Sequence, residues 1–354
     1  MFIYILFFLL LEITSFVDIV NLSKKSKNIF FNIVVFCSIL FLGGRYECDN
    51  DYANYITFYN DTPPLWEMTW NKFTQLYLGY QVEPLFFAFS TFFKSFLLSG
   101  QAIILFYAAA TIIISALFIK KTSNSPFISF FLYATCYFSL PFMQMRFGLA
   151  AACCLYAIYF LENNRKFSYW KWQLIAILFH MTGIIGLVYY AVRNITVTPK
   201  RSYLILASSF LFIFFPIRTI FTWGVSFIGM NRYLHYLNDE ATSLTSCIIH
   251  IILFSPLFIF QDRFRKDIKH FDLFFKMAIL AILLMAITHQ LPILNRFSLV
   301  FASSSCIFLT YYMGLFKHNK SNQVLVWLGL SFYALLKFYP SLQYIDNYQF
   351  FLFH

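Results

Sequence analysis

Apolar stretches of membrane-spanning length alternate with short polar connections along nearly the whole chain. A helix that crosses the hydrocarbon core needs about 20 predominantly apolar residues. The pattern therefore predicts an all-α polytopic membrane protein with about 10–12 transmembrane helices, folded as a single membrane domain over residues 1–354. The predicted segments are residues 1–20, 29–44, 84–98, 101–119, 126–142, 147–162, 170–192, 202–216, 243–261, 272–289, 297–314 and 323–340.

Two polar stretches, residues 45–83 and 217–242, are longer than the other connections. Basic residues indicate their side of the membrane, because cytoplasmic loops carry an excess of Lys and Arg. Lys24, Lys25 and Lys27 place the first connection in the cytoplasm. We therefore expect residues 45–83 to form the main extracytoplasmic loop and residues 217–242 to form a second one.

Segments 84–98 and 170–192 leave the topology open. The first is short and begins with Pro84, and the second is interrupted at His180. If both cross the membrane, five basic residues fall outside. If both are re-entrant, these residues stay in the cytoplasm and Arg146 faces outward. The sequence supports the two alternatives about equally; the five residues are Lys120, Lys121, Arg165, Lys166 and Lys171.

Composition excludes a soluble protein. Apolar residues make up 60% of the chain and charged residues 12%, whereas soluble domains carry about 25% charged residues. The net charge of +11 fits cytoplasmic loops beside a lipid bilayer and implies no nucleic-acid partner. The seven cysteines show neither CxxC nor zinc-type spacing, so we expect no disulfide framework, metal site or cofactor. Residues 1–20 lack a basic leading segment and a cleavage site, which predicts a span rather than a signal peptide.

The densest polar cluster follows the second apolar segment. Arg45, Asp49 and Asp51 lie within seven residues there, with Glu47 between them. One interpretation is a solvated loop, in which Arg45 lies at the helix end and extends its charged group into water. The other is a site for a phosphorylated lipid, because the planar fork of Arg matches phosphate oxygens.

Glu83 lies at the transition from the polar loop to an apolar segment. Its carboxylate could cap the first turn of a helix, where free backbone N–H groups attract negative charge. It could equally serve as a general base, if burial raises its pKa toward neutrality.

Arg146 and His180 each begin or interrupt an apolar segment. Arg146 precedes a run of small residues, which allows close helix packing. An Arg at membrane depth usually faces the bundle interior or a cavity, although an interfacial anchor is also compatible with this position. His180 could be a hydrogen-bonded core residue or a catalytic group. Arg232 and Arg296 are also predicted outside, and with Arg45 and Arg146 they oppose the usual charge bias, which suggests an anion site.

The order of these motifs resembles the EpsG-type polysaccharide polymerases, which are grouped with the O-antigen (Wzy) polymerases. Family members typically have Gly two residues before the Asp that aligns with Asp51. Asp49 stands there in this chain, which adds a second candidate carboxylate. The resemblance covers roughly residues 1–340 and rests on Arg45…Asp51…Tyr55, Tyr80-x-x-Glu83-Pro84, Arg146-x-Gly148-x-Ala150, Leu178-Phe179-His180 and Arg296 near a late span.

This resemblance implies a glycosyltransferase of the bacterial cytoplasmic membrane with an active site on the extracytoplasmic side. Such enzymes join undecaprenyl-pyrophosphate-linked oligosaccharide repeat units into a surface polysaccharide, such as O antigen, capsule or exopolysaccharide. A chain-length regulator is a further partner expected by family analogy.

The implied chemistry assigns roles to the candidate residues. Pyrophosphate would be bound by Arg45, Arg146 and Arg296, with Arg232 as a weaker fourth. The base candidates are His180, then Glu83, then Asp51, because a neutral His has a pKa near the working pH. Asp51 could instead orient Arg45 through a salt bridge. Tyr52, Tyr55 and Tyr80 suit either stacking on sugar rings or an interfacial aromatic belt.

Other functions remain compatible with the sequence. A transporter or flippase of lipid-linked oligosaccharide would also need many spans and outward basic residues, but would more often show repeated halves, and none is visible. A membrane transferase or ligase of glycan or acyl groups would use similar residue types.

Overall fold

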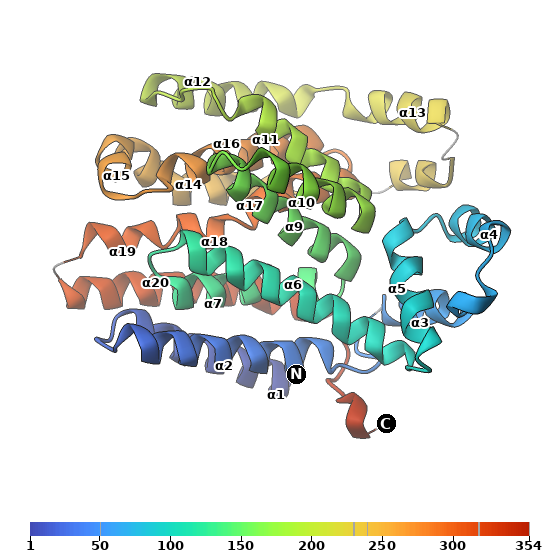
Figure 1. The fold of residues 1–354 in the computed structure, drawn as a ribbon. Coiled ribbons are helices and arrows are strands. Elements are labelled where there is room, and N and C mark those ends of the chain that lie inside the picture. The colour runs from blue at the N-terminus through green and yellow to red at the C-terminus, as the bar shows by residue number, and fades with distance from the viewer. Residues whose placement is uncertain (50, 229–230, 239, 318, 354) are drawn as a thin grey trace. The chain divides into compact units, whose positions relative to one another are not determined.

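The computed structural model describes residues 1–354 apart from residues 50, 229–230, 239, 318 and 354 (Figure 1). It is 80% helical, and its described residues form no strand, only isolated bridges such as Arg45–Phe350. Five helices among the described residues are long and apolar enough to cross a membrane, or up to eight if each of three bent pairs counts as one span. These features confirm the predicted all-α polytopic membrane fold.

The chain divides into two compact units. The first comprises Met1–Gly186 and Met313–His354, and the second comprises Leu187–Tyr312. The helices that build the first unit are α1 (Phe2–Ser15), α2 (Lys24–Gly43), α3 (Tyr52–Asp61), α4 (Trp70–Tyr80), α5 (Pro84–Ser95), α6 (Gly100–Thr122), α7 (Pro126–Cys136), α8 (Ser139–Phe142), α9 (Met145–Glu162), α10 (Lys166–Phe179) and α20 (Lys320–Ser341), with the 3-10 turns η1 (Phe16–Asp18), η2 (Leu65–Glu67), η3 (Met181–Ile185), η7 (Leu342–Tyr344) and η8 (Phe351–Phe353).

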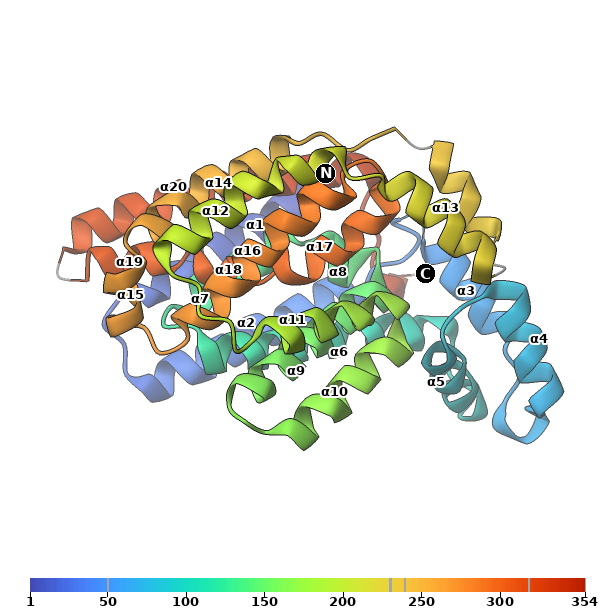
Figure 2. The same cartoon turned by 90° about the horizontal axis from the view of Figure 1, so that it is seen from above.

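Helices α2 and α6 lie side by side in the first unit and run in opposite directions (Figures 1 and 2). At one end, Gln101 Nε2 donates hydrogen bonds to the backbone oxygens of Gly43 and Arg45, at 2.9 and 3.0 Å. At the other end, Lys120 Nζ lies 3.5 Å from Asn32 Oδ1. We call these the Arg45 end and the Lys120 end of the first unit.

Both ends of segment 84–98 lie at the Arg45 end. Lys94, in the last turn of α5, hydrogen-bonds to the backbone oxygen of Asn60, and the Tyr59 hydroxyl donates to Leu98 O at 2.5 Å. The chain then enters α6 at Gln101, again at the Arg45 end. The 12 residues of α5 span about 18 Å, well short of a hydrocarbon core of about 30 Å. The contacts favour the re-entrant alternative for this segment.

Segment 170–192 also turns back. Helix α9 starts at the Arg45 end and finishes at the Lys120 end, where Lys121 Nζ lies 5.8 Å from the Tyr159 ring centroid. Helix α10 packs against α9 and returns to the Arg45 end at His180. The chain then reverses, because Tyr169 Oη, near the start of α10, donates to Gly186 O at 3.3 Å. The basic residues of the 120–121 and 165–171 stretches therefore gather at the Lys120 end, as the re-entrant alternative predicts.

The predicted loop 45–83 is largely helical, because it contains α3, η2 and α4. Its first residues are covered by residues 345–351, which we call the tail strap. Tyr46 N donates to Gln349 O at 3.0 Å, and Phe351 N donates to Gly44 O at 2.9 Å. Cys48, beneath the strap, is fully buried.

The second unit is built around α16 (Phe271–Thr288), most of whose residues are buried. Helices from both earlier and later in the chain pack against it. The other elements that lie wholly in this unit are α12 (Pro199–Ser209), η4 (Leu211–Phe214), α13 (Ile217–Ile228), η5 (Asn231–Asn238), α14 (Thr245–Ile259), α15 (Gln261–Asp267), η6 (Pro292–Leu294), α17 (Asn295–Ala302) and α18 (Ser305–Phe308), and two helices, α11 (Gly186–Val192) and α19 (Tyr311–Leu315), contain its boundaries.

Candidate active site

The first unit brings Glu83, Arg146 and His180 together. Arg146 Nη1 donates to Glu83 Oε2 in a close ion pair, and His180 Nε2 lies 3.9 Å from Glu83 Oε1. The three side chains are mostly buried, with exposed fractions of 19% for Arg146, 15% for Glu83 and 11% for His180. The site is therefore enclosed but has an open edge.

The backbone that carries Arg146 depends on a close helix contact. Arg146 is the second residue of α9, and the fourth is Gly148. A Cβ at Gly148 would lie 2.1 Å from Leu140 O in α8, so only glycine allows α8 to pack against this turn. The Arg146-x-Gly148 spacing thus sets the position of the guanidinium.

Glu83 ends the polar loop, immediately before α5. It occupies the N-cap position, but its side chain makes no capping hydrogen bond to α5. Its Oε1 instead accepts a hydrogen bond of 3.1 Å from the backbone N–H of Met181. One carboxylate therefore joins the start of α5 to α9 and to the turn after α10.

The electrostatics of Glu83 differ from the sequence-based expectation. Burial raises the pKa of Glu83, but the Arg146 guanidinium, His180 and the Met181 N–H together lower it below the ordinary value of 4.5. The prediction that burial would bring this pKa toward neutrality is wrong for this arrangement, because Arg146, His180 and the backbone hydrogen bonds together outweigh desolvation, the largest single influence. Glu83 is a carboxylate at neutral pH.

His180 follows α10 in an extended conformation, where the helix ends. Its Nδ1 accepts a hydrogen bond of 3.2 Å from Thr182 N–H and lies 2.9 Å from Thr182 Oγ1. Because the N–H occupies the Nδ1 lone pair, the neutral ring carries its proton on Nε2, which faces Glu83. Gly183 permits this turn, since a Cβ there would lie 2.6 Å from the backbone carbon of Ala176.

Two tyrosines flank the ion pair. The Arg146 guanidinium carbon lies 5.9 Å from the Tyr55 ring centroid. Burial raises the pKa of Tyr55, so its hydroxyl stays protonated. The Tyr107 hydroxyl from α6 is buried and has no hydrogen-bond partner among the described residues, and the same holds for Arg146 Nε. Sequence reasoning missed Tyr107, since nothing distinguishes it from other aromatics in apolar helices.

Arg45 belongs to a separate cluster at the same end of the unit. It is fully buried, its Nε donates to Asp49 Oδ2 at 2.7 Å, and its Nη1 donates to Leu42 O at 2.8 Å. Its guanidinium carbon also lies 4.8 Å from the Phe142 ring centroid. A phosphate could reach Arg45 only if this enclosure opened.

The structure shows Asp49 as an ion-pair partner of Arg45. The alternative role of Asp51, to orient Arg45 through a salt bridge, stays a prediction from the sequence. Asp51 is half-buried at the start of α3, and its backbone N–H donates to Asp49 Oδ1 at 3.1 Å.

Two of the candidate glycan-stacking tyrosines are held by other side chains. Tyr52 is buried and its hydroxyl donates to Gln101 Oε1 at 2.7 Å, which ties α3 to α6. Tyr80 donates to Asp61 Oδ2, within the 45–83 region. Tyr55 is the candidate that the structure places beside Arg146.

The remaining candidate arginines lie in the second unit. Arg296 is half-buried in the first turn of α17. Arg232 belongs to η5, and its side chain lies outside the described residues. Arg218, for which the sequence suggested no specific role, donates to Gln290 O at 3.1 Å and to Leu237 O at 2.9 Å. It therefore holds connecting segments of the second unit together.

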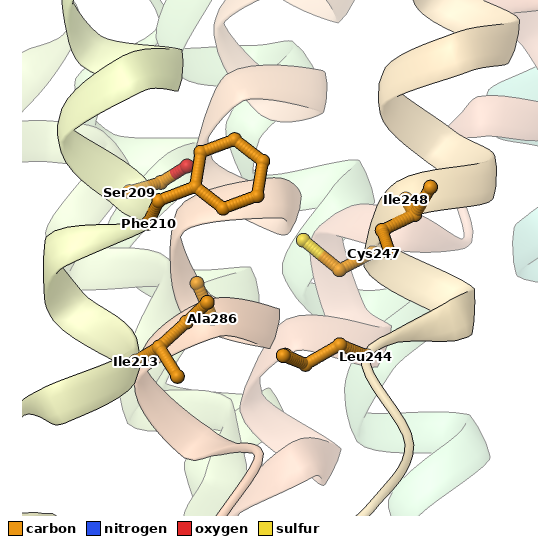
Figure 3. A pocket seen from close by; sticks show the side chains of 7 residues that line it. All are labelled: Ser209, Phe210, Ile213, Leu244, Cys247, Ile248 and Ala286. Carbon is orange, nitrogen blue, oxygen red and sulfur yellow. The ribbon is translucent and has the colours of Figure 1, made fainter.

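The second unit also contains a small apolar pocket between α12, α14 and α16 (Figure 3). Its polar atoms are few, and the Ser209 hydroxyl is already bonded to Leu206 O at 2.6 Å. This pocket therefore offers no catalytic chemistry; it is lined by Ser209, Phe210, Ile213, Leu244, Cys247, Ile248 and Ala286. Across the described part of the chain, no group of three or more His, Cys, Asp or Glu side chains could hold a metal ion.

Comparison with known proteins identifies the family. No curated protein and no solved structure matches the chain. The family model described as the EpsG family matches residues 28–353, a range that includes Glu83, Arg146 and His180. The match covers nearly the whole chain, so this protein belongs to the EpsG family, a family of Wzy-like polymerases.

Proposed function

We propose that this protein polymerises undecaprenyl-pyrophosphate-linked oligosaccharide repeat units at the outer face of the bacterial cytoplasmic membrane. Family membership supports a polysaccharide-polymerase function in general. The observation that carries the proposal further is the joining of Arg146, Glu83 and His180 in one part-buried site. The product is a surface polysaccharide such as O antigen, capsule or exopolysaccharide.

The reaction transfers the growing glycan from its lipid carrier to a sugar hydroxyl of the next lipid-linked unit. The hydroxyl oxygen forms a bond to the anomeric carbon, and the bond from that carbon to the pyrophosphate oxygen breaks. Undecaprenyl pyrophosphate leaves with the bonding electrons, and the hydroxyl proton passes to a base in the site. This step needs a cation at the leaving group and a proton acceptor at the nucleophile.

Arg146 supplies the cation in this proposal, because its guanidinium lies in an enclosed site beside a carboxylate and an imidazole. A positioned donor of this kind is typically worth about 3 kcal/mol in the transition state. The enclosure of Arg45 by Asp49 and the tail strap supports a structural role for it. Arg296 and Arg232, which belong to the second unit, stay candidates from the sequence alone.

The hydrogen bonds support a revised order of proton acceptors. His180 Nδ1 is occupied by Thr182 N–H, and its Nε2 carries the proton in the neutral ring. We therefore assign Glu83 as the proton acceptor and His180 as the donor that orients its carboxylate. Asp51, at the N-cap position of α3, is the weakest of the three candidates.

The charge at the two ends of the first unit supports the outward orientation. Lys120, Lys121, Arg165 and Lys166 lie at the end opposite Arg146. By the positive-inside rule, this charge supports a cytoplasmic location of that end and an extracytoplasmic location of the Arg146 end.

A surface-glycan gel tests the proposal. Cells that lack the protein would be complemented with wild type, Arg146→Gln, Glu83→Gln or the control Arg165→Gln, which removes an exposed Arg at the Lys120 end. We expect a ladder of polymer lengths with wild type and with the control. The two site variants, present at normal levels in the membrane, would leave a single-repeat band.

Two other results would contradict the proposal. Lipid-linked repeats trapped inside the cell after deletion would show that the protein moves its substrate across the membrane. A ladder unchanged by deletion would show that another protein polymerises the glycan.

A further inference from the structure

We propose that Glu83 occupies the diphosphate position on Arg146 in the resting protein and is displaced when the lipid diphosphate binds, which frees it to accept a proton. This inference rests on the proposed function and concerns the regulation of the same site. In this view the substrate itself activates the base, because binding and activation compete for one guanidinium.

The Arg146 guanidinium is only partly satisfied by Glu83. Nη1 donates to Glu83 Oε2, while Nε is buried without a hydrogen-bond partner among the described residues. The buried hydroxyl of nearby Tyr107 is likewise without a partner in the described part of the chain. A diphosphate has more acceptor oxygens and more charge than one carboxylate, so it can satisfy donors that Glu83 leaves open.

Glu83 has a second attachment that survives displacement. Its Oε1 accepts from Met181 N–H at 3.1 Å, while Oε2 is the atom that binds Arg146. Loss of the Arg146 contact would therefore leave the carboxylate anchored in the site and near His180 Nε2. In this proposal the Glu83 carboxylate, once released from Arg146, stays in the site and can accept the proton of the acceptor hydroxyl.

The burial of Glu83 turns displacement into activation. Desolvation favours the protonated carboxyl group, and Arg146 is the largest of the influences that oppose it. When Arg146 is neutralised by phosphate charge, desolvation is opposed only by the weaker contacts, so the carboxylate becomes more basic. As long as Glu83 stays paired with Arg146, its lowered pKa makes it a poor proton acceptor at neutral pH.

Binding measurements on the purified full chain in detergent test this inference. The probe is farnesyl diphosphate, which carries the lipid diphosphate but no sugar. We expect Glu83→Gln to bind it about tenfold more tightly than wild type, within the usual range of coupling between sites. Arg146→Gln should lose binding, and the double variant should show no gain over Arg146→Gln.

The matched control is Glu67→Gln, which neutralises an exposed carboxylate of the same 45–83 region that lies 4.0 Å from Lys72 Nζ. It should leave the affinity unchanged. If Glu83→Gln is not recovered folded, Glu83→Asp replaces it in the binding measurement. The shorter side chain cannot contact Arg146 and Met181 N–H at the same time. This variant should also bind more tightly than wild type.

The inference would be overturned if the folded Glu83 variant bound farnesyl diphosphate no more tightly than wild type. It would also be overturned if neither wild type nor the variant bound this probe. The polymerase proposal is judged separately by the glycan ladder in cells. A deletion that abolishes the ladder, combined with unchanged affinity in Glu83→Gln, would reject the displacement and keep the polymerase.

Discussion

The backbone N–H of Thr182 donates a hydrogen bond to Nδ1 of His180, two residues earlier in the chain. This contact fixes which nitrogen of the neutral ring carries the proton. Nε2 is then a donor directed at Glu83, at 3.9 Å from Oε1. In His180, the first candidate base by sequence, the basic nitrogen of the neutral ring is therefore already bonded by its own backbone.

Substitutions at His180 can separate the donor role from a base role. The side-chain nitrogen of Gln lies near the position of Nε2, so His180→Gln keeps a donor toward Glu83, while His180→Asn does not reach it. We expect His180→Gln to retain part of the polymerisation and His180→Asn and His180→Ala to lose roughly a hundredfold or more. The measurement is the initial rate of polymer formation in membranes. Equal loss in all three variants would restore His180 as the base.

Replacement of Arg146 by Lys tests the geometry of the cation. Lys keeps the charge but lacks the planar fork that binds two phosphate oxygens together. We expect Arg146→Lys to slow polymerisation by roughly a hundredfold, in line with about 3 kcal/mol of lost transition-state stabilisation. Polymer synthesis from lipid-linked repeats would be compared at equal protein levels. Wild-type rates in Arg146→Lys would show that a simple positive charge suffices.

The lowered pKa of Glu83 predicts an acid-sensitive contribution to stability. A group with a folded-state pKa below its unfolded value stabilises the fold above the unfolded value, here 4.5, and loses that contribution as the pH falls through the folded pKa. Thermal unfolding in detergent should therefore fall in temperature below about pH 4.5. The fall should be smaller in Glu83→Gln, which has no proton to gain. Parallel pH profiles for both proteins would contradict the assigned shift.

The contact between α8 and α9 can be tested through Gly148. A Cβ at this position would meet Leu140 O at 2.1 Å, and neither backbone can yield cheaply. We expect Gly148→Ala to destabilise the protein by about 1–3 kcal/mol and to reduce polymerisation by displacing Arg146. Gly329→Ala, in α20, is the matched control, because nothing lies within 4 Å of its added Cβ. Normal activity and stability in Gly148→Ala would refute the packing argument.

The tail strap predicts protection of Cys48. This residue is fully buried, and the Gln349 N–H contacts its Sγ at 3.2 Å, so the thiol is shielded from the surroundings. In a chain with Cys48 as its single cysteine, we expect slow maleimide labelling of the full-length protein and rapid labelling after deletion of residues 345–354. A chain whose single cysteine replaces Glu67, an exposed residue of the same 45–83 region, provides the accessibility control. Fast labelling of the intact protein would show that the strap does not cover this loop.

Sequence alone predicts the membrane fold well, because long apolar segments have few alternatives in a bilayer. It also identifies Glu83, Arg146 and His180 individually, since each is a polar residue at the edge of an apolar segment. It could not show that Arg146 pairs with Glu83, because 63 residues separate the two in the chain. The pKa of Glu83 depends on the distance in space between the two side chains. The same limit explains Arg45, where a choice between Asp49 and Asp51 depends on the local turn.

The topology shows a similar division. Counting of basic residues leaves two alternatives for segments 84–98 and 170–192. It assigns loops to a side of the membrane but gives no information on which residues are in contact. The hydrogen bond from Tyr169 to Gly186 and those from Gln101 to Gly43 and Arg45 favour the re-entrant alternative. Helix pairing, which depends on side chains far apart in sequence, therefore supplies what charge counting lacks.

The tail strap has a consequence for biogenesis. Its contacts join Cys48 to residues about 300 positions later in the chain, such as Asn347 and Gln349. Translation delivers residues 44–49 to the membrane long before residues 345–351 are made, so the contacts of this loop with the tail strap form only after α20 has been synthesised. A chain truncated before residue 345 would lack these contacts and leave residues 44–48 uncovered on this side.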